Sequence, residues 1–77
     1  MRAEIVFPTG REKRLLVYDA DYDPDLKTVT ALLLKKNKLY QNCVIVAKIK
    51  KITSGFGQVI YEGVLETDEA VKVRVYT

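Results

Sequence analysis

The fold depends most on residues 23–37, DPDLKTVTALLLKKN, because this segment separates two groups of strand-like sequence. Asp23 is a suitable helix N-cap, Pro24 suits the first helical position, and Asp25 suits the positive end of the helix dipole. Apolar residues then recur at helical spacing at Leu26, Val29 and Leu33. The segment is therefore interpreted as the chain's one helix.

The end of this segment also fits a helix. Lys35 and Lys36 fall in the last turn, and Asn37 suits the left-handed conformation that ends many helices. The competing interpretation makes Thr28 to Leu34 a strand, because Thr and Val favour extended backbone. The helix is the preferred interpretation of the two.

Strand-like sequence surrounds the helix on both sides. Alternating apolar residues, separated by Gly-, Pro- or Asp-containing turns, predict strands at Arg2–Phe7, Lys13–Tyr18, Tyr40–Ile52, Val59–Leu65 and Val71–Tyr76. The fold class is therefore α+β, a single small domain over residues 1–77 in the order β-β-α-β-β-β. Its sheet is mostly antiparallel, and the helix covers one face.

Strand parity assigns residues to the two faces of the sheet. The inner face, toward the helix residues Leu26, Val29 and Leu33, carries Ile5, Leu15, Val17, Ile45, Ile49, Val71 and Val73. The outer face carries Arg14, Lys48, Lys50, Lys72 and Arg74, with Tyr18 and Tyr76. Four apolar residues share that outer face, namely Val6, Leu16, Val44 and Val46. They need cover, from a sheet curled toward a partial barrel or from a second copy.

Charge is segregated along the chain, whose net charge is +3 and pI about 9.1. Residues 26–61 hold seven lysines and no Asp or Glu, whereas a short acidic run precedes them at Asp19, Asp21, Asp23 and Asp25. Such a block makes one side of a small protein positive, and a positive surface favours polyanions such as nucleic acid.

Several chemistries are disfavoured by what the sequence lacks. There is no His, which removes the usual general base and the commonest metal ligand. Cys43 is the only cysteine and lies in an apolar run, where a small buried side chain is expected. The alternating aspartates do not form a calcium loop, because Pro24 and Thr30 stand where such a loop needs Gly and Glu. We expect no enzyme activity, no cofactor and no metal.

The segment Ser54–Tyr61, SGFGQVIY, resembles the RNP1 octamer of RNA-recognition motifs. The match consists of Gly55, Phe56, Gly57, Val59 and Tyr61. Ser54 replaces the basic residue of that pattern, and Gln58 replaces a ring that stacks on a base in the family. The chain after Leu65 is too short for the helix and strand that the resemblance implies, so the chain is assigned to no family.

The preferred function is a small non-enzymatic nucleic-acid-binding protein, RNA ahead of DNA, and a homodimer or a larger ribonucleoprotein are the assemblies it could belong to. Basic residues of the sheet face and its surroundings are expected to contact phosphates, at Lys35, Lys36, Lys38, Lys48, Lys50, Lys51, Lys72 and Arg74. Phe56 and Tyr76 are expected to stack on bases, although a ring such as Phe56 most commonly folds back onto its sheet.

Two other classes of function remain open. The alternative is an interaction module that forms a homodimer through the apolar residues of the outer face. A third class is an RNA-cleaving toxin of the RelE kind, for which the chain has too little helix. A cytoplasmic location without membrane contact is expected from the absence of a leader or span, and the composition leans toward a thermophile.

Overall fold

The computed structural model describes residues 2–8, 13–33 and 44–77, and this part of the chain contains six strands and no helix. The strands are β1 (Arg2–Phe7), β2 (Lys13–Asp23), β3 (Thr28–Leu33), β4 (Val44–Gly55), β5 (Gln58–Leu65) and β6 (Ala70–Tyr76). Predictions that concern Lys35, Lys36, Asn37, Lys38 and 40–43, including Cys43, lie outside the described residues.

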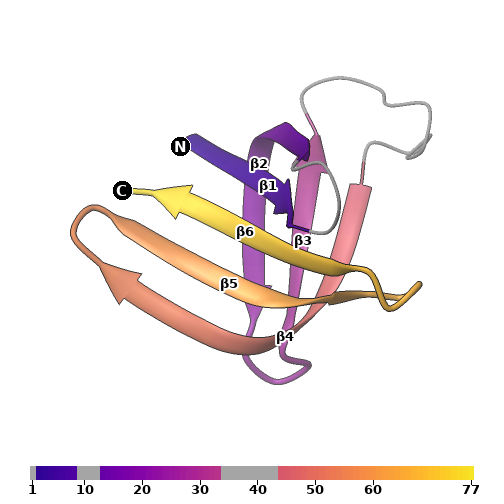
Figure 1. The fold of residues 1–77 in the computed structure, drawn as a ribbon. Coiled ribbons are helices and arrows are strands. Elements are labelled where there is room, and N and C mark those ends of the chain that lie inside the picture. Colours follow the sequence, from indigo (N-terminus) through magenta and orange to yellow (C-terminus); the bar gives the residue numbers. More distant parts are fainter. Residues whose placement is uncertain (1, 9–12, 34–43) are drawn as a thin grey trace.

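The six strands form a closed antiparallel barrel (Figure 1). Each strand pairs with the next along the chain, and β6 pairs with β1 to close the barrel. The predicted α+β class is therefore wrong. The apolar layer that a helix was expected to cover is covered instead by the opposite wall of the barrel.

The segment predicted to be a helix forms a turn at residues 24–27 and then a strand. Asp23 does accept backbone hydrogen bonds through Oδ1, from the N–H groups of Asp25 at 2.9 Å and Leu26 at 3.2 Å. An aspartate with this pattern begins a turn as readily as a helix. Lys27 then takes a left-handed conformation with φ of 55°, so the chain reverses and enters β3.

The strand interpretation of this segment is confirmed for Thr28–Leu33. Buried side chains at Val29, Ala31 and Leu33 alternate with exposed or partly exposed ones. Val29 and Leu33 are four positions apart, a spacing that puts them on one face of a helix and also on one face of a strand. The third residue of the predicted helix stripe, Leu26, is 67% exposed in the turn.

The strand β4 bends from one side of the barrel to the other. It runs beside β3 through its first half and then curves round to run beside β5 (Figure 1). The register shifts between Ile49 and Lys51, so Lys50 is an extra residue in a β-bulge, a feature that bends strands. Gly63 lies opposite, and a Cβ there would come within 2.9 Å of the Ile49 Cα and closer still to the Lys48 carbonyl.

The inner faces of the strands form one apolar core. The residues predicted to face inward are buried at Ile5, Val17, Ile45, Ile49, Val71 and Val73, and Leu15 packs against them while partly exposed. Among the four apolar residues assigned to the outer face, Val6 is buried, whereas Leu16, Val44 and Val46 are exposed. Closing the barrel covers the inner face and leaves those three in contact with solvent.

The hairpin between β4 and β5 is tighter than the predicted loop of Thr53–Gly57. Gly55 pairs with Gln58, which leaves Phe56 and Gly57 as a two-residue turn. Gly57 has φ of 69°, the positive value that the second central residue of a type II turn requires. The described residues include no helix with the length and apolarity that a membrane crossing needs.

Candidate nucleic-acid interface

Three lysines project from the bend of β4, and we call Lys48, Lys50 and Lys51 the bulge lysines. All three are exposed. In a regular strand, consecutive residues point to opposite faces, so Lys50 and Lys51 would be separated. The bulge adds one residue between Ile49 and Lys51 and resets the alternation, which leaves both of these side chains in solvent.

The bulge lysines form no ion pair with the carboxylates that the structure describes. Lys51 lies opposite Glu62 in the β4–β5 register. However, the Glu62 Oε1 lies 3.4 Å from the Nζ of Lys72 on the other neighbouring strand. The positive charge of the bulge is therefore available to a ligand.

Lys72 is in a different position from the bulge lysines. Its side chain is 42% exposed, but its ammonium is paired with Glu62 in the middle of the β4–β5–β6 face. A phosphate that approached Lys72 would have to compete with this carboxylate and would meet its negative charge.

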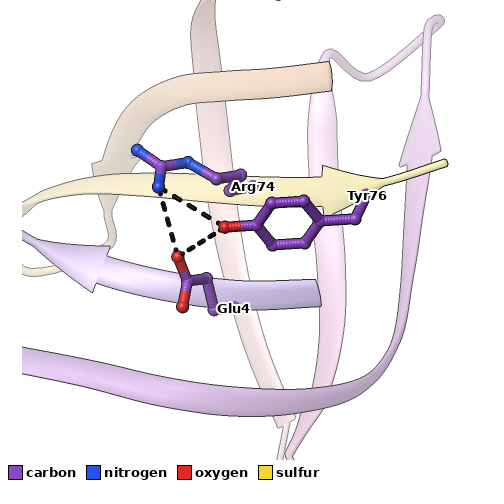
Figure 2. A network of polar contacts seen from close by, with 3 residues as sticks. All are labelled: Glu4, Arg74 and Tyr76. Carbon is purple, nitrogen blue, oxygen red and sulfur yellow. Dashed lines mark hydrogen bonds and ion pairs between the residues drawn. The ribbon is translucent and has the colours of Figure 1, made fainter. Parts of the chain in front are cut away.

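Arg74 belongs to a polar network with Glu4 and Tyr76 (Figure 2). Its Nη1 donates to the Glu4 Oε1 at 3.3 Å and to the Tyr76 hydroxyl at 3.5 Å. The Tyr76 hydroxyl donates to the same Glu4 oxygen at 3.1 Å. The side chains of Arg74 and Glu4 are only 30% and 14% exposed.

The ring of Tyr76 is also engaged on the protein. Its hydroxyl is held by Glu4, and the guanidinium of Arg2 lies 5.5 Å from the ring centroid, a cation–π distance. A base that stacked on the same ring face would have to displace Arg2. Tyr76 therefore contributes to the contacts between β1 and β6.

Phe56 is fully exposed at the tip of the β4–β5 hairpin. The backbone of the tip is held by the residue that follows β6, because the N–H of Thr77 donates to the Gly57 carbonyl at 2.9 Å. The ring does not fold back onto the sheet, the outcome that is commonest for such a side chain. It is displayed on a short turn whose backbone is held in place.

Lys27 was not among the residues predicted from the sequence to form the site. Its carbonyl accepts a 2.7 Å hydrogen bond from the N–H of Ile49, next to the bulge, and its side chain is exposed. Only membership of the acid-free segment indicated it, because the pairing of the β2–β3 turn with β4 is not visible in the sequence. Lys27 is therefore a fourth exposed lysine, and its backbone lies beside the bulge.

The acidic residues form two groups on the barrel, and one of them lies near a bulge lysine. Asp19 and Asp21 lie on β2, and Asp23 ends that strand. A second acidic group, formed by Glu66, Asp68 and Glu69, lies at the turn between β5 and β6. The charge segregation seen along the chain is therefore only partly kept in space, because Lys48 lines one groove with Glu66 and Asp68, and Lys72 and Arg74 are each paired with a glutamate.

The RNP1-like segment does not form the surface that the resemblance implies. Its last ring, Tyr61, stacks on Tyr22 with centroids 5.2 Å apart and packs against the core. Only Phe56 among its matched residues is an exposed aromatic. Comparison of the chain with models of known protein families, with curated proteins and with solved structures found no match.

Proposed function

We propose that this protein is a small, non-enzymatic nucleic-acid-binding barrel that grips a single strand along the β4–β5 hairpin, with RNA the first ligand to test. The observation that carries the proposal is the group of bulge lysines, which are exposed and form no ion pair with any described carboxylate. Exposed cations of this kind bind phosphates by releasing counterions, without regard to sequence.

The exposed aromatic ring adds the second element of the interface. Phe56 lies at the tip of the hairpin and the bulge lysines lie near its base, both on β4 or its turn. Aromatic rings stack on unpaired bases with little sequence preference, whereas paired bases in a duplex hide their faces. This arrangement favours a single strand with modest specificity.

The first experiment is fluorescence anisotropy with a labelled uridine oligonucleotide, titrated at several salt concentrations. Three phosphate contacts predict that affinity falls roughly 20- to 40-fold between 50 and 200 mM salt. The matching deoxythymidine oligonucleotide and a duplex are the controls for ligand type. Affinity that does not change with salt, or tighter binding of the duplex, would remove the support for this mode.

A second candidate function is a homodimeric interaction module. Leu16 is 63% exposed and Val46 is 51% exposed on the outer face, and Val44 lies opposite the exposed Leu32 in the β3–β4 register. Val6 is buried and drops out of this surface. Light scattering separates the two functions, because a dimer that persists at high salt and does not retard RNA would favour the module.

A further inference from the structure

The strand β4 extends beyond its partner β5. The β4–β5 register begins at Ala47 opposite Leu65, where β5 ends, and the chain then turns toward β6. Val44, Ile45 and Val46 still pair with β3 on their other side. Within the described residues, this stretch of β4 therefore has one neighbouring strand and one open edge.

The direction of the backbone groups along this edge follows from one hydrogen bond. The N–H of Ile49 donates to the carbonyl of Lys27, which precedes β3, so the backbone of Ile49 faces the β3 side. In an antiparallel pair the facing direction alternates from residue to residue. Ile45 therefore also faces β3, and the N–H and C=O groups of Val44 and Val46 face the open edge.

A groove lies along this edge. It has a volume of about 370 Å³ and is lined by Val44, Ile45, Val46, Leu65, Glu66, Thr67 and Glu69. The side chain of Ile45 is buried in the core, so Ile45 borders the groove with its backbone. A neighbouring groove of about 550 Å³ continues past Val46 to Lys48, Val64 and Asp68.

The rim of the groove is acidic. Glu66, Asp68 and Glu69 are exposed, and none of them is ion-paired in the described part of the chain. These carboxylates repel a phosphate backbone and attract cationic side chains. The groove therefore selects a different ligand from the one that suits the bulge lysines.

We propose that this groove binds an extended peptide segment rich in Lys or Arg and in β-branched residues, which adds to β4 as a further strand. The backbone groups of Val44 and Val46 supply a hydrogen-bonding edge, a mode in which main-chain bonds give affinity. The valine side chains and Leu65 supply apolar contact, and Glu66 and Glu69 pair with the basic residues of the segment.

The test uses hydrogen exchange followed by NMR on the full chain, with an alternating valine–lysine hexamer as the probe. In the protein alone, the amides of Val44 and Val46 exchange fast while those of Ile45 and Ala47 are protected by β3. At saturating hexamer, exchange at Val44 and Val46 slows by at least about tenfold. A hexamer with an N-methyl group on every residue has no backbone N–H at either edge, so it cannot complete a ladder and leaves both amides unprotected.

Two sets of variants assign the binding to the edge and its rim. Glu66→Gln combined with Glu69→Gln lowers the affinity for the hexamer about threefold to tenfold, as expected for the loss of two exposed ion pairs. Asp21→Asn combined with Asp25→Asn makes the same charge change outside the groove and leaves affinity unchanged. Val46→Pro removes one N–H donor, which faces the open edge, and abolishes binding of the hexamer. If this variant does not fold, the affinity of the Glu66→Gln, Glu69→Gln variant tests the proposal instead.

Four results would overturn the proposal. One is equal affinity for the valine–lysine hexamer and a valine–glutamate hexamer, and another is full binding by the N-methylated probe. A third is protection of Val44 and Val46 that appears without peptide and grows with protein concentration, which would assign the edge to a second copy. The fourth is protection by the uridine oligonucleotide in place of the peptide.

Discussion

The Nη1 of Arg74 lies 3.3 Å from the Oε1 of Glu4, across the pair of strands that closes the barrel. The two residues are direct partners in the β1–β6 register, although they are 70 positions apart in the sequence. The ion pair therefore links the first and last strands. The bulge lysines, in contrast, form no ion pair with the carboxylates that the structure describes.

The Arg74–Glu4 pair is expected to contribute more to stability than the Lys72–Glu62 pair. Glu4→Ala should lower the free energy of unfolding by about 1.5–3 kcal/mol, because it removes the carboxylate that accepts from both Arg74 and Tyr76. Glu62→Ala should cost less than about 1 kcal/mol, since that pair is more exposed. Urea unfolding of the two variants measures both values, and equal losses would contradict the structural role of the network.

The bulge at Lys50 should depend on Gly63. A methyl group at this position would collide with the backbone of Lys48 and Ile49, so Gly63→Ala should lower the free energy of unfolding by about 1–3 kcal/mol or more. Gly55→Ala is the matched control, because a Cβ there meets no atom within 4 Å, and its effect should stay within about 0.5 kcal/mol. Thermal unfolding of both variants checks the close approach of β4 and β5.

The turn that replaces the predicted helix should be improved by glycine. Lys27 has φ of 55°, a conformation that is unfavourable for residues with a Cβ, so Lys27→Gly should raise the free energy of unfolding by roughly 0.5–1 kcal/mol. Lys27→Ala keeps the Cβ and should give no such gain, which separates the backbone effect from loss of the lysine side chain. A gain in both variants would place the cause elsewhere.

The strands and most of the core could be predicted from the sequence. Along β1, β2 and β6, inward-facing residues such as Ile5, Val17, Val71 and Val73 alternate with outward-facing ones. This period of two residues is typical of a strand and is not produced by a helix. The segment at Thr28–Leu33 was predicted wrongly because Asp23 starts a turn with the same hydrogen bonds as a helix cap. A sheet curled toward a partial barrel was one of the two expected ways to cover the outer face, but full closure was not predictable, because the pairing of β1 with β6 joins the two ends of the described chain.

The candidate site was only partly visible in the sequence, for a similar reason. Strand parity placed Lys48 and Lys50 on the outer face, and these two residues and Lys51 are all exposed. The partners of Lys72 and Arg74 are carboxylates on neighbouring strands, and only the register brings them together. The bulge at Lys50 likewise depends on a contact with β5, so its effect on the two adjacent lysines could not be read from β4 alone.

Phe56 should affect binding without affecting stability. Phe56→Ala removes a fully exposed ring, so the free energy of unfolding should change by less than about 0.5 kcal/mol. Loss of stacking should weaken binding of the uridine oligonucleotide by about 1–3 kcal/mol. Phe56→Trp should restore binding, whereas Phe56→Leu should not, and equal affinities for the tryptophan and leucine variants would argue against stacking.

The central claim is tested most directly by how steeply RNA affinity depends on salt in a bulge variant. For the unmodified chain, the logarithm of the binding constant should fall against the logarithm of salt concentration with a slope of roughly −2 to −3. Replacing all three bulge lysines with Gln should bring the slope close to zero. The Glu62→Gln, Lys72→Gln double variant, which removes an ion pair without changing net charge, should keep the original slope. An unchanged slope in the bulge variant would contradict the account.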